Sequence, residues 1–282
     1  MEEEERHLEG SGLPRFSSFE LEFHTPSRAA EQPIDFQTES SKRYDAATFI
    51  QKLGEEAKVD QSCIAMATTY FHLFYCRHSF QQYKRHVLAV TCMYVAGKIC
   101  EYNKKKKPKD EKEIIVGFRD CLLQCFASIF YSKKDKAKTP PWKKLRKTLW
   151  AEVCAAEELL LDTIEYNFSI TSPYTHLMER LRALQEQNIY TCTEEVQHAA
   201  WYFLNDSLHK SVCLQYSPQT IATAAIRMAL LLKGPEPASK GLFLEEDVSA
   251  LDAIGLQMMD SFENSSVSLL NYDFSSSGKF IA

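Results

Sequence analysis

Few side chains in this sequence stand at the spacings that enzyme or metal chemistry requires. Glu195 and His198 form one Glu-x-x-His pair, which a helix would place on a single face. A di-metal helical bundle needs two such pairs and two further glutamates, and the second pair is missing. Cys121 and Cys125 also share a helix face, but no neighbouring His or Cys completes a tetrahedral zinc set. The chain has no phosphate-cradling glycine loop, no G-x-S-x-G and no H-E-x-x-H. We therefore expect no catalytic residue, no metal site and no cofactor.

Electrostatic attraction is the second kind of chemistry, and it is concentrated in one segment. The chain of 282 residues has a formal net charge of −5, yet residues 104–147 hold 15 Lys and Arg against 5 Asp and Glu. Such a segment concentrates positive charge on one side of a protein, where it can attract negatively charged partners. It contains the run Lys104, Lys105, Lys106, Lys107, which is typical both of a solvated loop and of a nuclear-import signal. We expect a nuclear protein.

The elements that must position these side chains are predicted to be helices. Apolar residues make up 45% of the chain, with only 9 Gly and 10 Pro, and no proline occurs between Ile34 and Lys107. Long stretches without proline or clustered glycine favour helices, so we predict an all-α fold. The apolar periodicity predicts helices over 41–57, 60–77, 81–101, 109–129, 143–166, 173–187 and 193–209, another from about 218, and shorter ones within 244–262. Asp60 and Thr193 are the predicted N-caps of two of these helices.

Two of the predicted helices are apolar on nearly every side, at Val87–Gly97 and Ile221–Leu232. A helix that is apolar all round has to be buried all round. The second run contains Arg227 and is far shorter than the roughly 20 residues that cross a bilayer, so we expect no membrane association. Aligning the two runs places Ala89 on Ala224 and Lys98 on Lys233. This weak repeat predicts two five-helix units, each with a buried central helix.

Prolines and changes in the apolar periodicity divide the sequence into four parts. Residues 1–40 lack periodicity and contain three prolines, which predicts a flexible N-terminal arm. The first helical unit is expected over 41–170, with a basic insert at about 130–147, and the second over 171–264. Residues 265–282 are predicted to form a loose serine-rich tail. The nine cysteines include no C-x-x-C pair, so we expect reduced thiols in an intracellular protein.

Several blocks of residues resemble the cyclin family, in particular the transcriptional cyclins of the K, T and Q types. In the first half these blocks are YFHLFY at 70–75, HSF at 78–80 and VAGK at 95–98. In the second half AWYFLNDSL at 200–208 and LQY at 214–216 resemble the start of the second cyclin box. Matching blocks run from about residue 24 to 233. The resemblance implies two tandem five-helix cyclin boxes, in agreement with the helix pattern.

The resemblance also implies a function and a binding surface. A cyclin is a non-catalytic regulatory subunit that binds and activates a cyclin-dependent protein kinase as a heterodimer. A transcriptional cyclin would direct that kinase to RNA polymerase II or its regulators, without contacting nucleic acid itself. Lys98 and Glu157 match the lysine and glutamate that bond to the kinase near its αC helix. The flanking positions on the third and fifth helices of the first box are Ile99, Glu101, Leu161, Tyr166 and Phe168. Glu101 is the only acidic residue soon after Lys98, where the family usually has two.

Two other functions are compatible with parts of the pattern. Transcription factor IIB is also a tandem cyclin-fold protein and binds promoter DNA, which requires basic residues in both repeats and usually a zinc ribbon. Positive charge here is confined to one segment, and no ribbon is present. The second alternative is a helical metalloenzyme built around Glu195 and His198, which a metal analysis would test. Without the resemblance, Lys98 and Glu157 are expected to be solvated, and Tyr166 and Phe168 to belong to the core.

Overall fold

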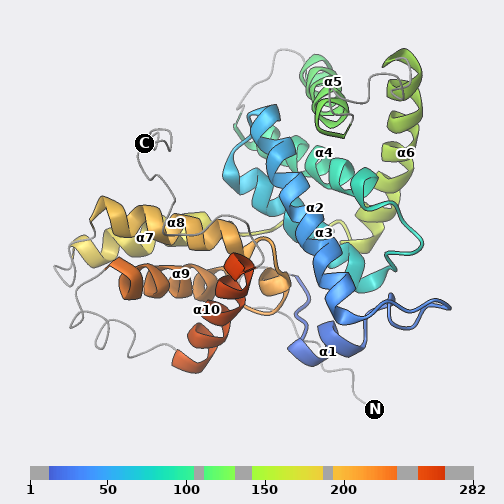
Figure 1. The fold of residues 1–282 in the computed structure, drawn as a ribbon. Coiled ribbons are helices and arrows are strands. Elements are labelled where there is room, and N and C mark those ends of the chain that lie inside the picture. The colour runs from blue at the N-terminus through green and yellow to red at the C-terminus, as the bar shows by residue number, and fades with distance from the viewer. Residues whose placement is uncertain (1–12, 105–110, 131–141, 187–192, 234–246, 264–282) are drawn as a thin grey trace. The chain divides into compact units, whose positions relative to one another are not determined.

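The computed structural model describes residues 13–104, 111–130, 142–186, 193–233 and 247–263. Within these ranges the ordered elements are all helices and no strand is present, which confirms the all-α prediction. The chain divides into two compact units, at residues 1–170 and 171–282 (Figure 1). The first unit contains α1 (Ser18–Phe23), α2 (Phe36–Ala57), α3 (Gln61–Arg77), α4 (Arg85–Lys104), α5 (Glu111–Phe130) and α6 (Trp142–Thr163). The second contains α7 (Pro173–Glu186), α8 (Glu194–Ser207), the 3₁₀ helix η2 (Ser211–Leu214), α9 (Pro218–Lys233) and α10 (Val248–Glu263).

Helix α4 is the centre of the first unit, where it packs against α2, α3, α5 and α6 (Figure 1). Every residue from Leu88 to Gly97 is buried, as the all-round apolar pattern predicts. Gly97 allows a close approach, because a methyl group at this position would overlap the ring of Phe118 on α5. The central helix is therefore packed against four neighbours along its buried length, and Lys98 follows directly after that length.

The N-terminal arm differs from the prediction in its described part. Residues 13–40 include α1 and the first turn of α2, and the side chains of Leu13 and Leu21 are buried. Polar residues explain the order: the Thr25 hydroxyl donates to the buried Glu39 carboxylate at 2.7 Å, and the Ser27 hydroxyl accepts from the backbone N–H of Phe80 at 3.0 Å. The sequence pattern missed these contacts because they join residues far apart in the chain and have no periodicity.

Three predicted or observed N-cap residues, at the starts of α2, α3 and α8, show how far local capping rules hold. Asp35 accepts from the Thr38 N–H at 2.7 Å, so α2 begins five residues before its predicted start. Thr193 accepts from the Val196 N–H at 3.4 Å, which confirms it as the N-cap of α8. Asp60 is the N-cap residue of α3, as predicted, but its side chain makes no capping hydrogen bond, so the expected bond to a backbone N–H is wrong. The cap position alone does not fix the rotamer that a capping bond needs.

Helix α9 is the centre of the second unit, where it packs against α7, α8, η2 and α10. Its residues from Ile221 to Ile226 are buried, as predicted. Leu231 and Leu232 are not: 59% and 45% of their surface is exposed. These two leucines lie in the last turn of α9, and an apolar run does not reveal where the neighbouring helices end. The predicted loose tail at 265–282 and most of the basic insert lie outside the described residues.

Candidate functional site

Lys98 and Glu157 are brought together by the two helices that carry them. Lys98 follows the buried part of α4, Glu157 lies on α6, and these two helices pack against each other. The Lys98 ammonium donates a hydrogen bond to a Glu157 carboxylate oxygen, and the two groups form an ion pair. Their side chains are 31% and 19% exposed. The pair is thus partly desolvated in the chain by itself, in contrast to the solvated arrangement expected from the sequence alone.

A series of side chains in contact, made of two cations and two aromatic rings, extends from this pair across three helices. The Lys98 ammonium lies 4.6 Å from the ring centroid of Tyr94, one turn earlier on α4. The Tyr94 ring meets Trp150 of α6 edge to face, with centroids 5.1 Å apart, and the Arg119 guanidinium of α5 lies 5.1 Å from the Trp150 ring. Burial raises the pKa of the Tyr94 phenol, and the nearby Glu157 carboxylate raises it further. These contacts restrict the Lys98 side chain to one direction.

Arg119, the last side chain of this series, also belongs to a small charged network with Asp120 and Arg146. Asp120 accepts two hydrogen bonds from one Arg146 guanidinium nitrogen, at 2.8 and 2.7 Å, and one from the Nε of Arg119 at 2.9 Å. These bonds, led by the one from Arg119, lower the pKa of the Asp120 carboxyl group. Sequence analysis did not single out Tyr94, Trp150 or Arg119. The four-residue spacing of Tyr94 and Lys98 was a usable signal, whereas Trp150 and Arg119 meet only through the fold.

The predicted apolar positions fall into two groups, one next to the ion-pair residues on α4 and α6 and one beyond the end of α6. Leu161 follows Glu157 by one turn of α6, and Ile99 follows Lys98 directly; both are half-buried. Tyr166 and Phe168 lie beyond the end of α6, with 59% and 40% of their surface exposed. The alternative in which these two rings belong to the core is therefore wrong. The side chain of Glu101 lies outside the described residues.

The turn that presents Tyr166 is strained, and residues at the end of α3 hold it. Glu165 and Tyr166 have φ values of 54° and 55°, a left-handed conformation that bulky residues rarely adopt. The Arg77 guanidinium donates to the Thr163 carbonyl at 3.0 Å and to the Glu165 carboxylate at 2.7 Å. The imidazole of His78 lies 2.8 Å from the Thr163 hydroxyl. Such strain persists only where the surroundings over-determine the backbone, and here the end of α3 does so.

The remaining sequence candidates do not gather into a site. In the described ranges, no three His, Cys, Asp or Glu side chains stand together as a metal site would require. The eight cysteines of those ranges are free thiols. Among the described helices, none has the length and apolar character needed to cross a bilayer. Lys104 is the last residue of α4, and the side chains of the run Lys104 to Lys107 lie outside the described residues.

Comparison with known proteins supplies an independent test of the resemblance. Residues 20–169 match the family model of the cyclin N-terminal domain. Cyclin-T1-4 of Arabidopsis thaliana is 30% identical over 257 residues, which cover 89% of this chain and 44% of that protein. Human Cyclin-K is 31% identical over 206 residues, which cover 73% of this chain and 31% of that protein. The chain thus spans about half or less of the length of the curated relatives that it matches.

Solved structures with the same fold extend the comparison across both units. A chain of the yeast RNA Pol II CTD kinase CTDK-1 complex superposes with a TM-score of 0.67 at 15% identity, over 91% of this chain and 75% of that chain. A chain of the CAK complex from Chaetomium thermophilum superposes with a TM-score of 0.57 at 16% identity, over 88% and 76%. At such identities the likeness speaks for the fold. Together with the family match over more than half of the sequence, and with curated relatives that are cyclins of the T and K types, it leads to one conclusion: the chain belongs to the cyclin family.

Proposed function

We propose that this chain is the non-catalytic regulatory subunit of a cyclin-dependent protein kinase that acts on RNA polymerase II or its regulators. The observation that carries the proposal is the Lys98–Glu157 pair, which the packed helices α4 and α6 bring together. By the resemblance, these two positions match the lysine and glutamate with which cyclins bond to their kinase. One superposed chain belongs to the yeast RNA Pol II CTD kinase CTDK-1 complex, and another belongs to the CAK complex of Chaetomium thermophilum bound to ATP-γ-S. Family membership supports the same role.

The mechanism follows from what a protein kinase lacks when it is alone. Activity requires the β3 lysine of the kinase to pair with a glutamate on its αC helix. A partner that binds only the inward position of that helix shifts the population towards it by its differential affinity. The surface of α4, α5 and α6 suits this task because Lys98 is held by Glu157 and Tyr94 before any partner arrives. We assign kinase binding to the first box, residues 41–170, and the second box to residues 171–264.

The proposal is tested by purifying the tagged chain from its own cells and identifying the protein kinase that accompanies it. The recombinant kinase is then assayed on a peptide of the RNA polymerase II CTD, with and without the chain. We expect at least a tenfold increase in phosphorylation when the chain is added. If a kinase binds and its rate does not rise, the chain is not an activator; if no kinase binds at all, the proposed role is wrong.

Tyr166 offers a variant that separates kinase binding from folding. Changing Tyr166→Gly relieves a left-handed conformation that costs a bulky residue on the order of 1 kcal/mol. The melting temperature should therefore stay the same or rise. Binding of the kinase should weaken, because an exposed aromatic ring is lost from the proposed surface. Thermal melts and a titration with the purified kinase measure both quantities, and unchanged affinity would remove Tyr166 from the surface.

We propose that the chain acts in the nucleus and that Lys104, Lys105, Lys106 and Lys107 contribute to its import. The run begins at the last residue of α4, and lysine-rich runs of this kind are recognised as import signals. A fluorescent fusion with the four lysines changed to serine should shift towards the cytoplasm. The matched control changes the four lysines of residues 133–138 to serine, and it should remain nuclear. An equal distribution of the parent and the first variant would show that the run is not a signal.

A further inference from the structure

Positive charge gathers on α5 and on the first turns of α6. Residues 115–129 of α5 and 142–151 of α6 hold five lysine or arginine residues against one aspartate. The carboxylate of that residue, Asp120, is already bonded to Arg119 and Arg146. Since the chain as a whole has a net charge of −5, this part of the first unit is a local excess of positive charge. Such an excess attracts an anionic partner.

Two lysines of this part, Lys143 and Lys147, stand one turn apart on α6 and are exposed. Neither has an ion-pair partner among the residues that the structure describes. Like charges four residues apart on a helix repel each other, and the first turn of α6 contains no acidic residue that would offset them. The helix therefore begins with an electrostatic repulsion that a bound anion would relieve.

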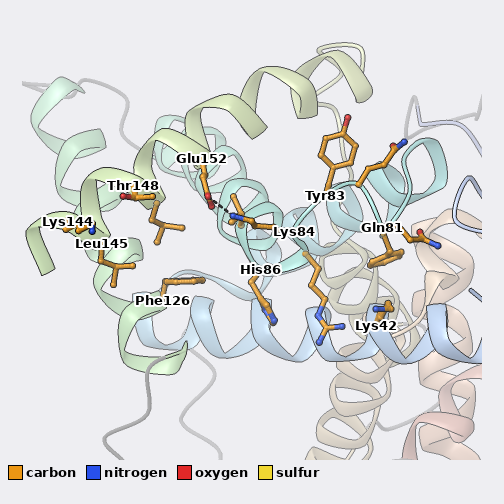
Figure 2. A pocket seen from close by; sticks show the side chains of 15 residues that line it. Lys42, Gln81, Tyr83, Lys84, His86, Phe126, Lys144, Leu145, Thr148 and Glu152 are labelled. Carbon is orange, nitrogen blue, oxygen red and sulfur yellow. Dashed lines mark hydrogen bonds and ion pairs between the residues drawn. The ribbon is translucent and has the colours of Figure 1, made fainter. Parts of the chain in front are cut away.

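The two lysines lie on a different side of α6 from the pocket of about 800 Å³ that this helix lines. The residues of α6 that Figure 2 labels on the wall of the pocket are Lys144, Leu145, Thr148 and Glu152. Lys143 and Lys147 do not line it. At 100° per residue, Lys143, Arg146 and Lys147 all lie within about 60° of Trp150 around the helix. These three cations form one basic strip with the Arg119 guanidinium, which lies 5.1 Å from the Trp150 ring.

An exposed aromatic ring stands at the end of the basic strip. Trp142, the first residue of α6, is 38% exposed and lies one turn before Arg146. Positive side chains beside an exposed aromatic ring are the usual features of a surface for single-stranded nucleic acid, since the cations follow the phosphates and the ring stacks on a base. The strip is also separate from the Lys98–Glu157 pair, because Lys147 precedes Glu157 by ten residues, which is about 15 Å along the helix axis.

We propose that the basic strip and Trp142 bind a single strand of nucleic acid, with phosphates at Lys143 and Lys147 and one base stacked on the indole. An indole offers a stacking face to every base, so the site accepts many sequences. A phosphorylated peptide would satisfy the lysines and leave the indole unused. The sequence alone did not lead to this site, because the net charge of the chain is negative and the cations of α5 and α6 meet only through the fold.

The proposal is tested with a fluorescent RNA 12-mer of uridine, titrated with the full chain and followed by anisotropy at several salt concentrations. Each phosphate of a single strand that the protein neutralises adds about −0.7 to the slope of log K against log salt. The variant Lys143→Gln/Lys147→Gln should therefore reduce the slope by about 1.4, and Lys143→Glu/Lys147→Glu should lower the affinity at least tenfold. The control Lys52→Glu/Lys233→Glu makes the same charge change at two other exposed lysines and should lower the affinity less than twofold.

The variant Trp142→Ala separates base stacking from charge. Loss of the ring should lower the affinity about fivefold or more, while the salt slope stays the same because an indole carries no charge. The same titration with a 12-mer of deoxyuridine distinguishes the two sources of a single strand. Weaker binding of deoxyuridine assigns the site to RNA through its 2′-hydroxyl groups, and equal binding assigns it to any single strand.

The proposal fails if RNA binds equally to the parent and to the two variants of Lys143 and Lys147, or if the control loses as much affinity as they do. It also fails if Trp142→Ala keeps full affinity, or if a peptide with several phosphoserines binds more tightly than RNA, since the surface would then select phosphate alone. Melting curves check the fold: Lys143→Gln/Lys147→Gln should melt no lower than the parent, because a repulsion at the start of α6 is removed. The assay uses no kinase, so its outcome is independent of the proposed activation.

Discussion

Exchanging the charges of Lys98 and Glu157 is expected to abolish kinase activation while the fold stays intact. The double variant Lys98→Glu/Glu157→Lys restores the ion pair within the chain, so the melting temperature should change by no more than about 2 °C. Loss of one partner of a buried charged hydrogen bond typically costs about 2–5 kcal/mol of binding free energy. The exchanged pair offers the kinase the wrong charge at both positions, so affinity should fall at least 30-fold. Binding titrations, CTD phosphorylation and thermal melts measure the three quantities.

The single variants and a second ion pair complete this experiment. Lys98→Glu alone places two carboxylates side by side, so it should lower both kinase affinity and, by about 1 kcal/mol or less, the free energy of unfolding. The control exchange, Arg227→Asp/Asp252→Arg, inverts the pair between α9 and α10, whose atoms lie 2.8 Å apart. It should leave activation unchanged. If the first exchange retains full activation, the pair is not part of the kinase surface; if it chiefly lowers the melting temperature, the pair is structural.

Most of the fold could be predicted from the sequence, because the signals of a helix lie in residues that are close together in the chain. Proline placement and apolar periodicity give the class, the two central helices and most helix bounds to within a few residues. The runs at Val87–Gly97 and Ile221–Leu232 marked the helices around which each unit packs. Leu231 and Leu232 show where this reasoning stops, since their exposure depends on the ends of other helices and not on their own neighbours in sequence.

The candidate site was accessible only through resemblance. A lysine on one helix and a glutamate 59 residues later give no local sign that they form a pair. The contact between Tyr94 and Trp150 is still harder to predict from the sequence, because an edge-to-face contact depends on the distance between two helices and on their rotation. The same holds for the N-terminal arm, where Thr25 and Ser27 are ordered by Glu39 and by the backbone of Phe80. Long-range polar contacts of this kind leave no periodic trace, and they explain why a segment with three prolines is packed.

The largest effect on stability is expected when the buried ion pair of Glu39 and Arg43 is broken. Glu39 and Arg43 are 3% and 7% exposed, and two guanidinium nitrogens of Arg43 donate to the carboxylate at 3.0 and 2.8 Å. Arg43 also donates to the carbonyls of His72 and Tyr75, each at 3.0 Å, so it ties α2 to the last turns of α3. Glu39→Ala leaves this buried cation without its counter-charge. Breaking a buried pair by removing one partner costs about 3–5 kcal/mol.

Glu55→Ala is the matched control, because Glu55 lies on the same helix, is exposed, and its carboxylate accepts a hydrogen bond from the Gln51 side chain at 2.7 Å. Its cost should stay within about 0.5 kcal/mol, as is usual for surface substitutions. Urea unfolding followed by circular dichroism measures both variants, with Glu39→Ala/Arg43→Ala as a third. Because the double variant removes the uncompensated charge, it should destabilise by clearly less than the sum of the two single variants. An additive result, or a Glu39→Ala cost no larger than that of Glu55→Ala, would mean that water reaches Arg43 and that the charge is not buried as the structure has it.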